Sequence, residues 1–153
     1  MTTDLVLPMP AESLIPHRPP MRLVDTLLSV ADGSGVTEAC PAAGCILADA
    51  RGELDAAALV ELIAQSYAAV KGYDDLANGR PVKKGFLVGV RKLRITGRAF
   101  TGNRLLTTIR TVGTFEGFAV AEGEIVCAGE TIAAGTIKLW IVDEEIAAGG
   151  GPL

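Results

Sequence analysis

The sequence predicts an α+β fold in which an antiparallel sheet of six strands is wrapped around one long central helix. Residues 55–72 form the clearest helical segment, and this segment is apolar on nearly every face. Two strand-like segments precede it, and four more follow in succession, separated by short turns. Because a helix that is apolar all around must be covered all around, a curled sheet accounts best for this pattern.

The chain is 153 residues long, so we expect residues 1–153 to form a single domain. Its composition, 49% hydrophobic and 21% charged, excludes general disorder. The amino terminus lacks the pattern of a secretory signal, and there is no run of 18 apolar residues, so we expect a cytoplasmic protein without a membrane span. The three cysteines, Cys40, Cys45 and Cys127, show no Cys-x-x-Cys spacing. We therefore expect reduced thiols and no metal site.

Prolines and glycines mark where the elements before the helix begin and end. Five prolines interrupt residues 1–20, leaving a lead-in with room for one helical turn at 12–15. Residues 21–30 then predict a strand, Gly33 and Gly35 a turn, and the following residues a second strand that ends at Cys40. An irregular loop is expected at 41–52.

The helix is expected to begin at an Asp55 cap and to stop at Gly72, with a loop over 73–84. The strands predicted after it are 86–95, 104–112, 118–127 and 131–142, and residues 147–153 are expected to be a loose tail. One six-stranded sheet covers only part of such a helix. The rest of the helix surface then needs another cover, and a second copy of the domain in a dimer would supply it.

Two polar side chains stand out within the apolar helix. Glu61 and Gln65 are four residues apart and so lie on one face. Burial among apolar side chains favours the protonated form of a carboxylic acid, which is the form that a general acid needs. A structural hydrogen bond or a solvent-facing side chain is the alternative. His17, the only histidine, lies in a proline-rich segment and is the only imidazole available as a base at neutral pH.

The charges are unevenly distributed. The net charge is −4, yet residues 80–110 contain nine Lys or Arg residues and no Asp or Glu. This segment predicts either a docking surface for an acidic partner or a set of solvated strand charges. With 5% aromatic residues and an acidic total, nucleic-acid binding is not expected.

At these residues the sequence resembles the beta-hydroxyacyl-[acyl carrier protein] dehydratases, which have the hot-dog fold. Residues 14–25, LIPHRPPMRLVD, are similar to the opening segment of that family. Residues 59–65, LVELIAQ, resemble its central-helix motif, in which Gln follows Glu by four residues. Residues 86–105 resemble its third motif. The Pro-His-Arg-Pro-Pro-Met opening and the Gly-Phe-Leu-Val-Gly-Val strand resemble those of a divergent branch found with aryl-polyene pathways.

The resemblance implies dehydration of a 3-hydroxyacyl thioester carried on the phosphopantetheine arm of an acyl carrier protein, with no other cofactor and no metal. It implies Glu61 as the acid, His17 as the base, Gln65 as their orienting neighbour and helix-start amides near 54–57 as donors to the thioester carbonyl. It also implies a homodimer, or a heterodimer with a related subunit. The residues expected to meet the substrate phosphate or the carrier protein are Arg18, Arg80, Lys83, Lys84, Arg91, Lys92, Arg94 and Arg98.

One departure from the family pattern leaves two alternatives open. The family carries an active-site histidine in a loop before the central helix, and the corresponding residues 40–52 contain none. The chain is then also compatible with a degenerate subunit that binds carrier protein and pairs with an active dehydratase. A hot-dog thioesterase that uses Glu61 alone, with His17 in a structural role, is the other alternative.

Overall fold

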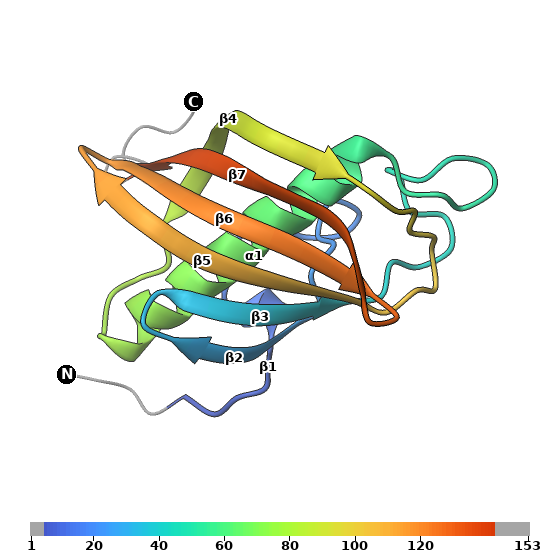
Figure 1. Cartoon of the computed structure of the whole chain (residues 1–153). Coiled ribbons are helices and arrows are strands. Elements are labelled where there is room, and N and C mark those ends of the chain that lie inside the picture. Colours follow the sequence, from blue (N-terminus) through green and yellow to red (C-terminus); the bar gives the residue numbers. More distant parts are fainter. Residues whose placement is uncertain (1–4, 143–153) are drawn as a thin grey trace.

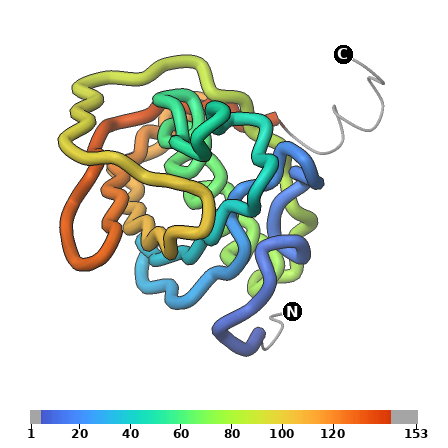
Figure 2. Tube along the Cα trace, turned by 90° about the vertical axis from the view of Figure 1, so that its right-hand side faces the viewer, coloured from blue at the N-terminus to red at the C-terminus, as the bar shows by residue number. Residues whose placement is uncertain are grey.

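A computed structural model describes residues 5–142, and the predicted tail at 147–153 lies outside this range. One long helix, α1 (Ala56–Ala77), packs against one face of a seven-stranded antiparallel sheet (Figure 1). The sheet has the strand order β1-β2-β3-β5-β6-β7-β4. Its strands are β1 (Met9–Pro10), β2 (Thr26–Ala31), β3 (Ser34–Ala39), β4 (Lys84–Ile95), β5 (Leu105–Phe115), β6 (Phe118–Cys127) and β7 (Glu130–Val142). In Figure 2 the strands curve around the helix, as the sequence predicts.

The predicted strand count is wrong by one, because β1 consists of only two residues. Met9 and Pro10 pair with Leu27 and Thr26 at the edge of the sheet. A 3-10 turn, η1 (Ala11–Ser13), follows at the place where a helical turn was predicted. So short a strand leaves no alternating pattern in the sequence, and the other six strands are those that the sequence predicts.

The strand predicted over 21–30 is confirmed only from Thr26 onward. The backbone amides of Leu23 and Val24 donate to the side chain of Gln65, at 2.8 Å and 3.3 Å, instead of to a neighbouring strand. A side chain of the helix therefore takes the hydrogen bonds that would have extended β2. These two hydrogen bonds fix the segment between the lead-in and β2 against α1.

The predicted start of the helix is confirmed and its predicted end is wrong. The Asp55 side chain accepts a hydrogen bond from the amide of Ala58 at 3.1 Å, which caps the first turn. The helix then continues through Gly72 to Ala77. A Cβ atom at Gly72 would lie 2.1 Å from the carbonyl oxygen of Leu14. The glycine thus serves a close approach of the lead-in to the helix, and it does not end the helix.

The core lies between α1 and the inner face of the sheet. Leu62 and Ile63 of the helix are fully buried, as are Ile109 and Ile125 of the central strands. Gly123 on β6 permits this contact, because a Cβ atom there would lie 2.4 Å from Ile63 Cγ2. Within residues 5–142, no helix has the length and apolar character needed to cross a membrane.

Candidate active site

The lead-in and the central helix bring two titratable side chains of one chain to the same pocket. His17 comes from the loop after η1, and Glu61 comes from the second turn of α1. The remaining helical lining is Ala64, Tyr67, Ala68 and Lys71, and Ala64, Ala68 and Lys71 continue the stripe of α1 that Glu61 begins. Strands β4 and β7 supply the opposite wall. The structure thus places the predicted acid and the predicted base together within one subunit.

Gln65 is the residue that fixes this arrangement. Its side chain is fully buried, and its Oε1 accepts the amides of Leu23 and Val24. Its Nε2 donates to the carbonyl of Met21 at 2.9 Å and to Glu61 Oε2 at 3.3 Å. One amide group therefore holds the segment that follows His17 and orients the Glu61 carboxylate. This is the geometry expected of a positioning residue.

His17 is half-buried, and its surroundings favour the neutral imidazole. Desolvation is the largest effect and lowers the pKa of His17 below its usual 6.5. The Glu61 carboxylate opposes this shift, and the Arg18 guanidinium adds to it. Within the described residues, the buried Nδ1 atom of His17 has no hydrogen-bond partner. A neutral imidazole has one ring nitrogen with a free lone pair and is suited to accept a proton, and because Nδ1 is buried this would be Nε2.

The pocket is too small in the single chain to hold an acyl thioester. Its cavity volume is about 60 Å³, whereas pockets for ligands of drug size measure roughly 300–1,000 Å³. Gly85 and Leu87 of β4 form one wall. This strand is one of the two edges of the sheet, and its Phe86, Val88 and Val90 side chains are 39% to 53% exposed. A wall with so much uncovered apolar surface is suited to be completed by another subunit.

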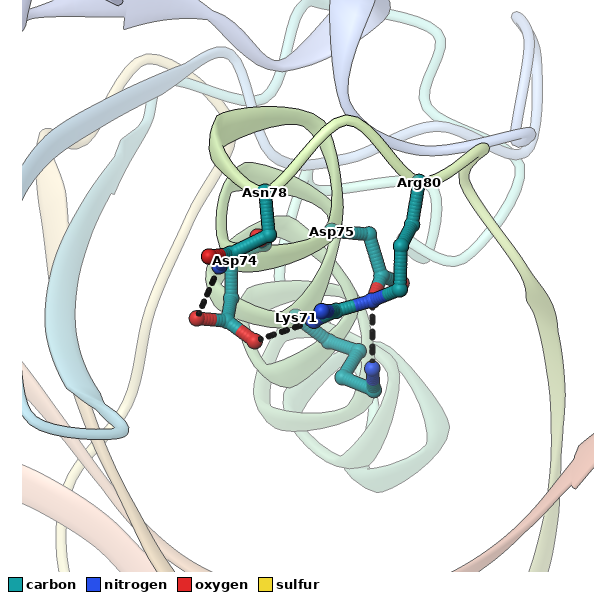
Figure 3. A network of polar contacts seen from close by, with 5 residues as sticks. All are labelled: Lys71, Asp74, Asp75, Asn78 and Arg80. Atoms are coloured by element: carbon teal, nitrogen blue, oxygen red, sulfur yellow. Dashed lines mark hydrogen bonds and ion pairs between the residues drawn. The ribbon is translucent and has the colours of Figure 1, made fainter. Parts of the chain in front are cut away.

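A second polar cluster lies toward the carboxyl end of α1 (Figure 3). Asp75 is fully buried, and its Oδ1 atom accepts both Lys71 Nζ at 2.6 Å and Arg80 Nε at 3.1 Å. Arg80 also pairs with Asp74 at 3.0 Å. Burial raises the pKa of the neighbouring Tyr67 to about 12, and Asp75 and Asp74 add to the shift. Lys71 and Tyr67 both line the His17–Glu61 pocket.

Sequence reasoning missed Lys71 and Tyr67 as pocket residues. Lys71 was detectable, because positions 61, 64, 68 and 71 follow the spacing of one helical stripe. In a helix that ends at Gly72, as the sequence predicts, this lysine belongs to the last turn, where basic side chains are common. Tyr67 lies beside the stripe and gave no comparable signal.

The predicted basic residues do not form one continuous free surface. Arg80 and Arg98 are engaged in ion pairs, the latter with Glu53 at 3.0 Å. Arg18 donates to the carbonyls of Ile15 and His17, so it braces the lead-in. Outside the predicted set, Arg104 pairs with Glu38 and Arg110 pairs with Glu122. Within residues 5–142, the basic residues of this segment that form no ion pair are Lys83, Lys84, Arg91, Lys92 and Arg94.

The helix start does not line this pocket in the single chain, so its role as a source of carbonyl donors stays a prediction. The amide of Leu54 donates to Ala99, and that of Asp55 donates to Leu47, at 2.8 Å and 3.0 Å. Residues 54–57 are also absent from the lining of the His17–Glu61 pocket. Among the described residues, no cluster of His, Cys, Asp or Glu could hold a metal ion.

Comparison with known proteins identifies a sequence family. The profile of the ApeP-like family, described as ApeP dehydratase, matches residues 9–148. No curated protein sequence matches the chain significantly.

Solved structures share the hot-dog fold. A chain of the dehydratase heterocomplex ApeI:P from Xenorhabdus doucetiae is 23% identical with a TM-score of 0.81, and the match covers 94% of this chain and 99% of that one. The E. coli PaaI protein from the phenylacetic acid degradation operon is 17% identical with a TM-score of 0.58, over 74% and 80% of the two chains. A hypothetical thioesterase with coenzyme A from Streptococcus pneumoniae is 13% identical with a TM-score of 0.59, over 76% and 84%.

Proposed function

The chain belongs to the ApeP-like family of dehydratases, and from this we propose that it eliminates water from a 3-hydroxyacyl thioester carried on an acyl carrier protein. The observation that carries the proposal is the shared pocket of His17 and Glu61, with Glu61 oriented by Gln65. Elimination of water requires one group that takes a proton and one group that gives a proton, and these two side chains can fill those roles.

The reaction proceeds with one proton taken and one given. His17, neutral at pH 7, accepts the proton from the carbon next to the thioester carbonyl. A double bond forms as the bond to the 3-hydroxyl group breaks. Glu61 donates a proton to the departing oxygen, so that water leaves. The imidazolium and the carboxylate that remain return to the starting state by transfer of one proton.

A partner subunit is part of the proposal. The small cavity and the exposed apolar edge of β4 favour completion of the pocket by a second hot-dog chain. The structurally similar Xenorhabdus doucetiae protein is a dehydratase heterocomplex, which supports a related but different subunit as the partner. This chain would then contribute Glu61 to a mixed site. A second copy of the same chain is the other form of this assembly.

The test is hydration of a short enoyl pantetheine thioester by the chain alone and by its complex with a hot-dog partner. Glu61→Gln should abolish the activity, because an amide cannot exchange the proton. His17→Ala should lower kcat by about 10²- to 10⁴-fold, the usual weight of a positioned acid–base group. Glu124→Gln makes the same chemical change at an exposed residue of β6 and should leave the rate unchanged.

Each other outcome of this test has a clear meaning. Full activity of the His17 variant would remove the histidine from the role of base. An inactive chain that becomes active only with a partner, irrespective of His17, would favour the degenerate-subunit alternative. Hydrolysis of the thioester in place of hydration, lost in Glu61→Gln and kept in His17→Ala, would favour a thioesterase.

We further propose that β4 docks the acyl carrier protein. Lys84, Arg91, Lys92 and Arg94 are exposed on this strand and form no ion pair within residues 5–142. The same strand forms a wall of the pocket, so a carrier bound here is close to the site. Charge reversal at Arg91 and Lys92 together should weaken carrier binding by at least about tenfold, and added salt should weaken binding to the unaltered chain. Binding that is indifferent to both changes would contradict this docking surface.

A further inference from the structure

Lys71 and Lys83 give the pocket a cationic end, and no role in proton transfer accounts for them. Lys71 follows Glu61 by ten residues on the same helical stripe, which corresponds to roughly 15 Å along the helix axis. Lys83 is the sixth residue after the end of α1, on the return to β4, and it lines the same pocket. The pocket is therefore lined by an acid–base pair and by two lysines, and along the helix Lys71 lies at the other end of the lining from Glu61.

Resting on the proposed function, we propose that Lys71 and Lys83 form an anion subsite for the thioester substrate. The anionic group is either the phosphate of the phosphopantetheine arm or a carboxylate at the far end of the acyl chain. Either group would bind to the lysines while the reacting carbons lie at His17 and Glu61, because an extended pantetheine arm or a long acyl chain spans a comparable length.

The ion pairs around Asp75 hold Lys71 ready for such a ligand (Figure 3). The ammonium group of Lys71 is tied to Asp75, and its side chain is 25% exposed. Because Asp75 Oδ1 also accepts Arg80, one buried carboxylate is shared between two cations. Together with Asp74, which pairs with Arg80, the cluster carries no net charge, and the Lys71 ammonium group makes one hydrogen bond within residues 5–142. A side chain held in place in the free protein loses less conformational entropy when it binds a ligand.

Stability alone gives no reason for this cluster. Buried ion pairs contribute little to stability compared with apolar side chains of similar volume, because both charges must be desolvated. Lys83 is half-buried at the pocket, and it forms no ion pair within residues 5–142. An unbalanced cation beside an already clamped one favours an anion as the missing partner.

The test measures binding of saturated thioesters, which the enzyme cannot dehydrate. S-hexanoyl phosphopantetheine is compared with S-hexanoyl pantetheine, and these two differ only in the phosphate. A second pair of S-acyl pantetheines differs only in a terminal carboxylate or methyl group. Calorimetric titrations use the chain alone and its complex with a hot-dog partner. The variants are Lys71→Gln, Lys83→Gln, Lys71→Arg and, as a matched control on the exposed face of β7, Lys138→Gln.

We expect the unaltered protein to bind the anionic member of one pair about tenfold more tightly, the effect of one charge-assisted contact. The pair that shows the preference identifies the phosphate or the carboxylate as the anion. Lys71→Gln and Lys83→Gln should remove the preference, whereas Lys71→Arg and Lys138→Gln should keep it. Lys83→Gln breaks no ion pair of the described chain, so its loss of preference cannot be attributed to unfolding.

Equal affinity within both pairs, or a preference that survives in folded Lys71→Gln and Lys83→Gln proteins, would overturn the inference. This result is distinguishable from failure of the proposed function. A chain that hydrates enoyl thioesters but shows no preference has the activity without the subsite. A chain that shows a lysine-dependent preference but is inactive in every assembly retains the subsite and loses the dehydratase proposal.

Discussion

At the scale of single residues, Gln65 links two parts of the chain that the sequence presents far apart. Its amide group binds the backbone of residues 21–24 on one side and the Glu61 carboxylate on the other. Loss of this side chain would leave the two buried backbone amides of Leu23 and Val24 without partners, each at a cost of about 1–3 kcal/mol. The same residue therefore stabilises the fold and orients the site. The sequence predicts its place on the Glu61 face, but not its contacts with the lead-in.

The single histidine makes a pH-dependent prediction possible. Because the pKa of His17 is lowered in the native protein, the unfolded chain binds more protons just below pH 6.5. The contribution of His17 to stability is therefore fully present above pH 6.5 and is lost as the pH falls toward the native pKa. Urea unfolding at a series of pH values should show this decline, and His17→Gln should flatten it. Equal slopes for both proteins in this window would contradict the burial of the imidazole.

At the scale of elements, α1 shows how a tertiary contact can override a local signal. A glycine after a run of apolar residues usually marks a helix end, yet here the chain continues to Ala77. The reason is the carbonyl oxygen of Leu14, which occupies the space where a side chain at position 72 would lie. That contact joins residues remote in sequence, so no local pattern could have predicted it.

Gly72→Ala should therefore destabilise the protein although alanine is the better helix former. Propensity alone predicts a gain of about 1 kcal/mol. The clash with Leu14 is expected to reverse the sign and cost about 1–3 kcal/mol, and it should also disturb the lead-in that carries His17. Chemical denaturation measures the change. Gly113→Ala is the matched control, because a Cβ atom there meets no atom within 4 Å. A stabilised Gly72→Ala protein would contradict the described approach of the lead-in to the helix.

At the scale of the whole molecule, the sequence predicts most of the fold and less of the site. Long periodic segments, such as α1 and the strands β4 to β7, carry their own signals. The two-residue β1 and the shortened β2 depend on pairing partners and on Gln65, which no local pattern reveals. The roles implied for His17 and Glu61 stay predictions, but their placement in one pocket follows from the packing of the lead-in on the helix.

The same packing leaves β4 as an uncovered edge of the sheet. Whether another chain binds to this strand therefore decides whether the pocket is complete. Exposed apolar strands at a sheet edge are prone to pair with another chain. Val88 is 53% exposed on this strand. We expect Val88→Lys to prevent the proposed assembly, because a charge would have to be buried at the contact, and to lower thioester hydration by leaving the pocket open.

Size-exclusion chromatography with light scattering, run on the chain alone and with a co-expressed hot-dog partner, measures the assembly. Val112→Lys is the control, since Val112 is 51% exposed on β5, away from this edge. A complex that forms only with the partner would establish the heterodimer, and one that forms alone would establish the homodimer. If Val88→Lys assembles and reacts like the unaltered protein, β4 is not the contact. The small cavity of the single chain would then have to open by a movement within the subunit itself.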